Sequence, residues 1–209
     1  MSSSLKSIYS ERREKLLQPV CDRLQTLLLD YFNSEPRIDR VTTRAKTVKS
    51  FIEKATKQEN GAAVYSDPLN QIQDQIGARI ITFYRCDVER IASLVLKYFR
   101  PIEDHLIVPE RDSECGYFGR HFVLFCPSDV FDQKSDADDG PKFFELQIKT
   151  LYQHAWSEAN HNLGYKESQA LTPEEKRKVA FTAAQSWGAD TILEELFKEK
   201  SNSCMESDA

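Results

Sequence analysis

Four short runs rich in β-branched and aromatic residues constrain the fold of this chain most strongly. Each run is too short for an ordinary helix and has the composition of a strand. The runs are GARIITFY (77–84), HLIV (105–108), HFVLFC (121–126) and FFELQIK (143–149). Because helical segments lie between and around them, we expect an α/β protein of the α+β kind, with a mixed β-sheet flanked by helices.

Apolar residues recur with a helical period in the remaining segments. This period predicts helices over Ser10–Phe32, over the C-terminal half of residues 37–57, over Asp87–Phe99 and after Thr150. A capping-box pair in residues 172–175 predicts a long final helix through about Lys198, followed by a polar tail. Residues 59–68 and 132–140 carry turn residues, so we expect a loop and a solvated hairpin loop there.

Size and composition place the chain in a broad class. With 209 residues, of which 40% are apolar, it can bury a sizeable core as one domain with a helical extension. No apolar run approaches the roughly 20 residues that a membrane span requires, and the N-terminal MSSSLKSIYSERREK lacks the apolar stretch of a secretory signal. We therefore expect a cytoplasmic protein without a membrane partner.

Charge and cysteine usage exclude further classes. The net charge of -5 argues against a protein that coats nucleic acid with its whole surface, although residues 37–57 form a local basic patch. The five cysteines are scattered and contain no Cys-x-x-Cys pair. Neither a disulfide framework nor a zinc knuckle fits this spacing.

The basic patch contains the first candidate site. Arg44, Lys46, Ser50 and Lys54 follow an R-x-K-x-x-x-S-x-x-x-K pattern. On a helix, positions 46, 50 and 54 would align two cations and a hydroxyl along one edge, an arrangement suited to gripping a chain of phosphates. A solvated basic helix face has the same pattern.

Two carboxylates near strands are the next candidates. Asp74 precedes Gly77 and Arg79 at the entry to the first strand, and Glu145 is the acidic residue in an otherwise apolar run. Mg²⁺ is usually held by one or two carboxylates together with substrate phosphates. Asp74 and Glu145 are therefore candidate Mg²⁺ ligands, although an aspartate such as Asp74 is by itself more often a turn residue and Glu145 points either to solvent or to a site.

A glycine-flanked loop and a polar helix face complete the set. In RDSECGYFGRH, Tyr117 stands between glycines and has the freedom to stack on a base, with Arg120 and His121 close by in sequence. His154, Glu158 and His161 share one face of the helix expected after Thr150, but their spacing differs from that of zinc proteases, so a polar face is the better interpretation. Together the candidates supply what phosphoryl transfer requires.

Read in order, five motifs resemble the synthetase domain of the RelA/SpoT family. They are RAKTVKSFIEK (44–54), DQIGAR (74–79), GYFGRH (116–121), ELQIKT (145–150) and HAWSEANH (154–161). The resemblance covers residues 37–166, with an N-terminal helical segment (1–36) before it and a C-terminal helix with a polar tail (167–209) after it. The single-domain length is similar to that of a small alarmone synthetase.

The resemblance implies a nucleotidyltransferase-like fold and a defined reaction. Such proteins use Mg²⁺ and move the β,γ-diphosphate of ATP to the 3'-hydroxyl of GDP or GTP, which gives (p)ppGpp and AMP. By resemblance, the residues on the ATP side would be Arg44 and Arg79 around adenine, with Lys46, Ser50 and Lys54 on the phosphates.

The remaining roles follow from the same resemblance. Asp74 would bind Mg²⁺, and Glu145 would either share the metal or accept the proton of the attacking hydroxyl. The residues on the acceptor side would be Tyr117, His121 and Gln147, with Arg120 beside them. The helix after Thr150 would then back the pocket, with His154, Glu158 and His161 either behind the contacting residues or on the acceptor side.

The acceptor loop departs from the family pattern, and this keeps alternatives open. Family members commonly have a lysine shortly before the Gly-Tyr pair, whereas the residues before it here are ERDSEC (110–115). They also commonly have a serine two residues after the tyrosine, where this chain has Gly119. One alternative is a toxic-type relative that pyrophosphorylates the tRNA 3' end or an adenine nucleotide. Another is a non-catalytic module that senses nucleotides. We also expect a homo-oligomer, since small synthetases of this family often form one.

Overall fold

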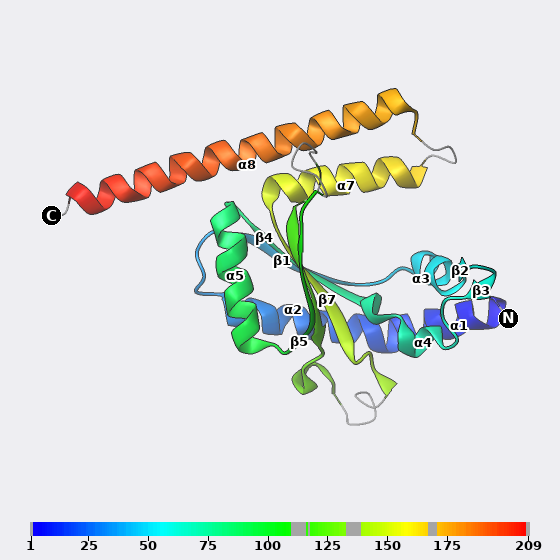
Figure 1. Cartoon of the computed structure of the whole chain (residues 1–209). Helices are drawn as coiled ribbons and strands as arrows, with labels where there is room; N and C mark the ends of the chain where they lie inside the picture. The colour runs from blue at the N-terminus through cyan, green and yellow to red at the C-terminus, as the bar shows by residue number, and fades with distance from the viewer. Residues whose placement is uncertain (1, 110–115, 117, 133–138, 167–170, 208–209) are drawn as a thin grey trace.

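A computed structural model of the chain describes residues 2–109, 116, 118–132, 139–166 and 171–207. Its centre is a five-stranded sheet in the order β1-β4-β7-β6-β5 (Figure 1). The strands are β1 (Ile38–Ala45), β4 (Ile76–Thr82), β5 (Pro101–Ile107), β6 (Gly119–Phe125) and β7 (Phe143–Thr150). Only the β4–β7 pairing is parallel among these, so the sheet is mixed. The α+β class and the four strands expected from the sequence are confirmed.

Strand β1 is the strand of the central sheet that the sequence did not reveal. Its burial alternates, with Val41 and Ala45 buried on one face and charged or hydroxyl side chains on the other. An edge strand with one polar face lacks the continuous apolar run of a central strand. Helix α3 (Val48–Ala55) begins only after it. The expected alignment of Lys46 with Ser50 and Lys54 along one helix is therefore wrong, because Lys46 lies in the turn before α3.

The N-terminal segment forms one long helical rod. Helix α1 (Ser2–Arg12), a π-helical turn (Arg13–Leu17) and α2 (Gln18–Phe32) follow each other with right-handed helical backbone at the junctions. Pro19 follows this π-turn and lacks the N–H that a regular helix would use, which is a common setting for such a bulge. The helix predicted over Ser10–Phe32 is confirmed and starts earlier.

One face of the sheet carries the core. Helices α2 and α5 (Arg85–Tyr98) both pack their apolar residues against this face. The strands contribute alternate residues to the same cluster, which include Val41, Ile80, Phe122, Phe144, Leu146 and Ile148. Because side chains alternate along a strand, the residues between them point to the opposite face.

Helices α7 (Leu151–Lys166) and α8 (Pro173–Ser207) pack side by side at the end where β7 stops (Figure 1). The predicted capping box starts α8. The Thr172 hydroxyl accepts from Glu175 N at 3.3 Å, and the Glu175 carboxylate accepts from Thr172 N at 2.8 Å. The helix continues past Lys198 to Ser207. No helix of the described residues is long and apolar enough to cross a bilayer.

Short elements fill the predicted loop between α3 and β4. Strands β2 (Gln58–Glu59) and β3 (Ala62–Ala63) form a small hairpin. Asn60 and Gly61 at its tip have φ of 52° and 79°, the left-handed values that a tight hairpin turn requires. Two further short helical elements, α4 (Pro68–Gln71) and a 3-10 turn (Gln73–Gln75), then lead into β4. A last 3-10 turn (Ser128–Val130) follows β6.

Candidate functional site

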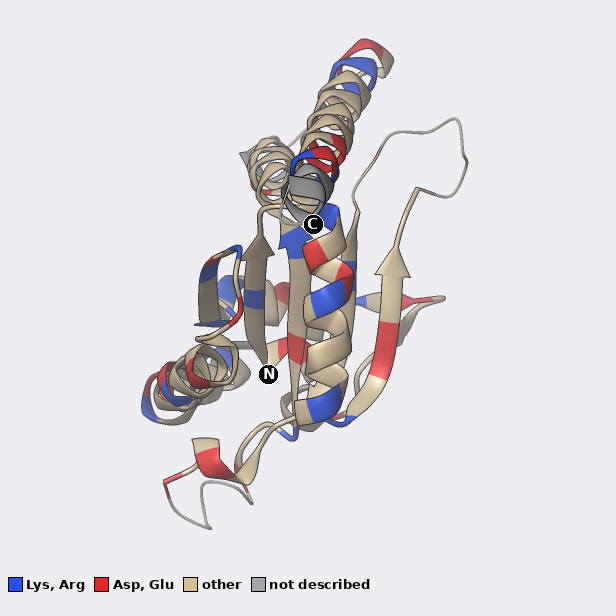
Figure 2. Ribbon diagram, turned by 90° about the vertical axis from the view of Figure 1, so that its left-hand side faces the viewer, with Lys and Arg blue, Asp and Glu red and all other residues tan. Residues whose placement is uncertain are grey.

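The face of the sheet opposite the core brings most of the candidate residues together. Strand register places Arg44 opposite Gly77, Gly77 opposite Glu145, and Gln147 between Arg79 and His121. Residues directly opposite each other on paired strands point to the same face. Arg44, Arg79, Glu145, Gln147 and His121 therefore share one surface. Figure 2 shows charged residues on the strands as well as on the helices.

Asp74 lies at the edge of this surface between two lysines. Its Oδ2 is 2.7 Å from Lys46 Nζ, and its Oδ1 is 3.1 Å from Lys54 Nζ. The second contact is an ion pair without hydrogen-bond geometry, so the buried Oδ1 has no hydrogen-bond donor. The carboxylate sits in the 3-10 turn before β4, while the lysines flank the start and end of α3. Two cations and one carboxylate thus meet from three segments.

Helix α1 supports this part of the site from behind. The Tyr9 ring stacks on Phe51 of α3 with centroids 3.6 Å apart, and its hydroxyl donates to the Lys46 carbonyl at 3.0 Å. Lys46 N donates to Gln75 O at 2.8 Å, which ties the turn after β1 to the turn before β4. These contacts fix the backbone at Lys46 and the direction of α3.

The start of α3 places Ser50. Thr47 is the N-cap residue, and its hydroxyl accepts from Ser50 N at 3.2 Å. The Thr47 hydroxyl also lies 2.9 Å from the Ser50 hydroxyl. Ser50 and Lys54 are one turn apart on the helix, so they face the same side. The Ser50 hydroxyl and the Lys54 ammonium group therefore lie on one edge of α3.

Glu145 is held by two neighbours on the sheet. Its Oε1 accepts from Gln147 Nε2 at 3.1 Å and lies 3.4 Å from His121 Nδ1. Burial alone would raise the pKa of this carboxyl, but the hydrogen bonds from His121 and Gln147 and the charge of Lys46 lower it to about 2. Glu145 is therefore an ionised carboxylate at neutral pH.

A second charged group lies where the sheet meets α7. Arg79 Nη1 is 2.6 Å from Glu158 Oε1. Lys149 is almost fully buried beside them and donates to the Ser157 hydroxyl at 3.2 Å. Burial, followed by the charge of Arg79, lowers the pKa of Lys149 to about 8. Burial and Lys149 also lower the pKa of His154.

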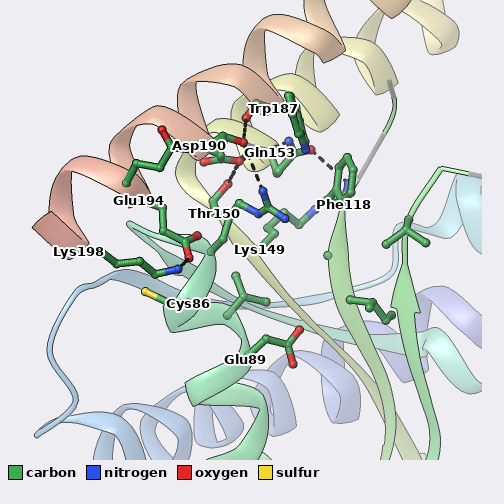
Figure 3. A pocket seen from close by; sticks show the side chains of 17 residues that line it. Cys86, Glu89, Phe118, Lys149, Thr150, Gln153, Trp187, Asp190, Glu194 and Lys198 are labelled. Carbon is green, nitrogen blue, oxygen red and sulfur yellow. Dashed lines mark hydrogen bonds and ion pairs between the residues drawn. The ribbon is translucent and has the colours of Figure 1, made fainter. Parts of the chain in front are cut away.

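Two cavities open on this surface and share Glu145. The first, of about 230 Å³, is lined by Asp74, Lys54 and Glu145 with Tyr65 and Glu103. The second, of about 160 Å³, is lined by Arg44, Gly77, Arg79, Glu145 and Gln147 among others. A larger cavity of about 510 Å³ lies between α5, α8 and the start of β6 (Figure 3). Neither Asp74 nor Glu145 lines that cavity, so we place the chemistry at the two smaller ones.

Some candidate residues lie apart from this surface. Arg120 points to the opposite face, where its guanidinium contacts Asp104 at 2.6 Å and Glu89 at 3.3 Å. Tyr117 lies outside the described residues. Glu158 of α7, by contrast, contacts Arg79 of this surface. Within the described part of the chain, no group of three or more His, Cys, Asp or Glu side chains could hold a metal ion.

Several residues of the site did not stand out in the sequence. Thr47 has a local signal, because a threonine just before a helical period is a common N-cap. Tyr9, Tyr65 and Glu103 have none. Tyr9 reaches the site through the packing of α1 on α3, and Glu103 through the pairing of β5 with β6. Tyr65 lines the first cavity from the segment between β3 and α4.

The fold and site together define a class: α+β proteins whose mixed sheet presents cations and two carboxylates on the face opposite its core. Residues 43–170 match the sequence profile of the region found in RelA / SpoT proteins. The chain therefore belongs to the RelA/SpoT family.

Individual relatives agree with this assignment. The chain is 29% identical over 149 residues to the GTP pyrophosphokinase YjbM of Bacillus subtilis (strain 168), a match that covers 68% of this chain and 63% of that protein. The match thus spans less than two thirds of that relative's length.

Solved structures share the fold. The small alarmone synthetase 1 of Bacillus subtilis superposes with a TM-score of 0.73 at 24% identity, over 92% of this chain and 99% of that one. The same synthetase bound to its product pppGpp gives a TM-score of 0.73 at 23% identity, over 91% and 97%. A GTP pyrophosphokinase family protein of Streptococcus pneumoniae gives 0.73 at 23% identity, over 93% and 95%. At these identities the likeness establishes the fold.

Proposed function

We propose that this protein is an ATP-dependent pyrophosphokinase. It transfers the β,γ-diphosphate of ATP to the 3'-hydroxyl of GDP or GTP, makes (p)ppGpp and releases AMP. Membership in the RelA/SpoT family supports this function, as does the relative named a GTP pyrophosphokinase. The observation that carries it is that Asp74, Lys54 and Glu145 line one cavity.

The ATP phosphates bind to Lys46, Ser50 and Lys54. The two ammonium groups already hold a carboxylate, Asp74, at 2.7 and 3.1 Å. Phosphate oxygens are stronger acceptors with more charge, and lysines bind them as point charges. The Ser50 hydroxyl adds a donor on the same edge of α3.

The adenine ring lies between Arg44 and Arg79. On the antiparallel β1–β4 pair Arg79 faces Thr42 and Gly77 faces Arg44, so the two arginines are diagonal neighbours. Such neighbours are about 7–8 Å apart. A flat ring that contacts a planar group on each side needs about 3.5 Å per side, or about 7 Å in all. The spacing of Arg44 and Arg79 therefore suits an adenine ring with one guanidinium group stacked on each of its faces.

Asp74 and Glu145 fit a bound Mg²⁺ ion. Asp74 Oδ1 is buried and lacks a hydrogen-bond donor, and Glu145 is ionised, so the site offers two hard oxygen ligands. When bound, Mg²⁺ would neutralise charge on the transferred phosphates. A carboxylate with a pKa of about 2 is a weak proton acceptor at neutral pH. Glu145 is therefore better suited to the ligand role than to the role of general base.

His121 and Gln147 lie on the acceptor side. Both contact the Glu145 carboxylate, so an acceptor that binds them lies next to the proposed metal site. Tyr117 remains a prediction from the sequence for the residue that stacks on the acceptor base. Arg120 is left out of the proposed acceptor site, because it is engaged with Asp104 and Glu89 on the other face.

No observation favours the tRNA alternative. Most cations of the basic patch at 37–57 face a carboxylate in the fold. The pairs are Arg37–Asp87, Arg40–Asp39, Lys46–Asp74, Lys49–Glu53, Lys54–Asp74 and Lys57–Glu59. Such pairing weakens the attraction of the patch for a nucleic-acid backbone.

A homo-oligomer is part of the proposal. Helix α8 exposes apolar side chains, with Phe181 at 65%, Ile192 at 59% and Leu196 at 48% of full exposure. Apolar side chains on one extended helix are the kind of surface that a second copy covers. Light scattering after gel filtration measures the assembly directly.

The transfer of labelled phosphate tests the function. The protein is incubated with Mg²⁺ and ATP labelled in its γ-phosphate, and GDP, GTP, GMP, AMP, ADP and bulk tRNA are offered separately. We expect label on GDP or GTP, resolved by thin-layer chromatography, and its loss in Glu145→Gln. Glu14→Gln is the matched control, since Glu14 is exposed on the N-terminal rod.

The other outcomes are equally informative. Label found only on tRNA or on an adenine nucleotide would show that the acceptor is not a guanine nucleotide. Binding of ATP without transfer to any acceptor would leave the nucleotide-sensing module as the function.

A further inference from the structure

A buried hydrogen-bond network lies where β7 turns into α7. Three residues in it are each only 2% exposed: Thr150 at the end of β7, Gln153 in α7 and Asp190 in α8. Gln153 N donates to the Thr150 hydroxyl at 3.1 Å, and this hydroxyl donates to Asp190 Oδ2 at 2.7 Å. Figure 3 shows the three side chains meeting between the two helices, with Phe118 beside Gln153.

The network fixes the orientation of the Gln153 amide. Asp190 Oδ2 accepts from Thr150, so it faces Gln153 as an acceptor, and Gln153 Nε2 lies 3.4 Å from it. Nε2 also lies 3.5 Å from the Ser186 hydroxyl. With the amide nitrogen turned toward α8, Oε1 points the other way and accepts from Phe118 N at 3.2 Å.

This last hydrogen bond extends the sheet beyond its regular pairing. The β6–β7 register ends at Arg120 opposite Ile148. Strand β7 ends at Thr150, and the chain then turns into α7, so at Phe118 the acceptor for the backbone N–H is a side chain and not a strand partner. The Gln153 side chain supplies that acceptor. Phe118 follows Tyr117 in sequence and precedes the strand that carries His121.

We propose that Gln153, oriented by Asp190, is a positioning residue for the acceptor nucleotide. It anchors the backbone at the entry to β6 and so sets the place of His121, three residues further along the chain. Because Asp190 belongs to α8, the same contact links the long C-terminal helix to the acceptor site. The inference rests on the proposed function for its kinetic consequences, while the anchoring itself does not.

The inference predicts a selective kinetic defect. Gln153→Met keeps the side-chain length and removes the amide, so we expect the KM for GDP to rise about tenfold, the effect of losing one buried hydrogen bond. The KM for ATP should stay within about twofold. Ser186→Ala is the matched control, because it removes only the 3.5 Å contact.

A paired exchange separates positioning from general damage to the fold. In Asp190→Asn alone, the new amide can donate to Gln153 Oε1 if the Gln153 amide turns around. Phe118 N then loses its acceptor, so the KM for GDP should rise. In Gln153→Glu with Asp190→Asn, the new carboxylate accepts from both Phe118 N and the Asn amide. We expect the pair to restore the KM for GDP to within about threefold of the original value.

A readout without catalysis decides the anchoring. Exchange of the Phe118 amide hydrogen, followed by NMR, should accelerate in Gln153→Met and recover in the paired variant. Unchanged exchange in Gln153→Met would overturn the inference, as would equal increases in the KM for ATP and for GDP. If the unaltered protein transfers no label, the proposed function fails, and the exchange rates still decide whether Gln153 anchors Phe118.

Discussion

Lys46 Nζ lies 2.7 Å from Asp74 Oδ2, and this ion pair joins the turn after β1 to the turn before β4. The same carboxylate faces Lys54 at 3.1 Å. Asp74 therefore pairs with Lys46 and Lys54, the two lysines that we assign to the ATP phosphates. Binding of ATP must replace these contacts or share them through a metal ion, so the effect of removing Asp74 should depend on Mg²⁺.

Asp74→Asn should uncouple ATP binding from turnover. Without Mg²⁺, the lysines lose their internal partner, and we expect a non-hydrolysable ATP analogue to bind as tightly as before or up to about tenfold more tightly. With Mg²⁺, turnover should fall at least about a hundredfold. Titration calorimetry with and without Mg²⁺ measures the first effect and label transfer the second. Asp30→Asn on the exposed side of α2 is the control; weaker binding without Mg²⁺ would contradict the assignment.

Arg79→Lys should impair ATP recognition more than acceptor recognition. Lysine keeps the positive charge and its attraction to Glu158, now at 2.6 Å from Arg79, but it lacks the planar group that stacks on adenine. We expect the KM for ATP to rise about tenfold and the KM for GDP to change less than about threefold. Steady-state kinetics with each substrate varied in turn measure both. Equal defects for the two substrates would place Arg79 elsewhere in the mechanism.

Glu145 should make stability depend on pH in the acidic range. The pKa of this carboxyl falls from 4.5 to about 2 in the folded protein, so between these values the unfolded chain binds the proton more readily. Stability from Glu145 is therefore complete above about pH 4.5 and is lost as pH falls toward 2, with an upper bound of about 3 kcal/mol. Urea unfolding of the original protein and Glu145→Gln should show a difference that shrinks below pH 4.5. A difference independent of pH would show that the ionised carboxylate is not held as described.

The strands that contain a short apolar run were predictable from sequence, and they include the exposed edge strand β5. Strand β4 reads as an apolar run because five of its seven residues are buried. Strand β1 was not predictable, since it has no such run and places Arg40, Thr42 and Arg44 on its polar face. The alternation of polar and apolar residues along β1 is also found in a basic surface segment, and only the pairing with β4 distinguishes the two.

The grouping of the site residues came from family resemblance rather than from local pattern. That Arg44 lies opposite Gly77, and Gln147 beside His121, depends on strand pairings between distant segments, and no local spacing encodes them. The two faces of β6 show the same limit. Arg120 and His121 are neighbours in sequence, yet alternation sends them to opposite sides of the sheet.

Tyr9 should couple the N-terminal helix to the phosphate side of the site. Tyr9→Phe keeps the stack on Phe51 and removes the hydrogen bond to the Lys46 carbonyl, so we expect a loss of about 1 kcal/mol in the free energy of unfolding. Tyr9→Ala also empties a fully buried position and should cost about 3–5 kcal/mol, with a higher KM for ATP. Urea unfolding and ATP kinetics measure these effects. Tyr9→Ala with normal stability would contradict the packing of α1 on α3.

The buried carboxylate of Asp87 should be a stability determinant that is separate from the site. It lies at the start of α5 with a side chain that is 1% exposed, and it accepts from Arg37 at 2.8 Å and from Arg90 at 3.1 Å. Arg37 has φ of 64°, a left-handed value that costs a non-glycine residue about 1 kcal/mol, and its contact with Asp87 holds it there.

Asp87→Asn should therefore destabilise the fold while leaving the chemistry intact. Removing the charge takes from Arg37 the carboxylate that it pairs with, while Arg90 still contacts Glu35, and we expect this to cost about 2–4 kcal/mol. Asp132→Asn is the matched control, because Asp132 also pairs with an arginine, Arg23, but is 66% exposed; its loss should cost less than about 1 kcal/mol. Urea unfolding compares the two, and the KM for ATP of folded Asp87→Asn should stay within about twofold of the original. If both variants lose the same small amount of stability, the buried Arg37–Asp87 pair contributes no more than the surface Arg23–Asp132 pair. Apolar packing alone would then hold β1 against α5.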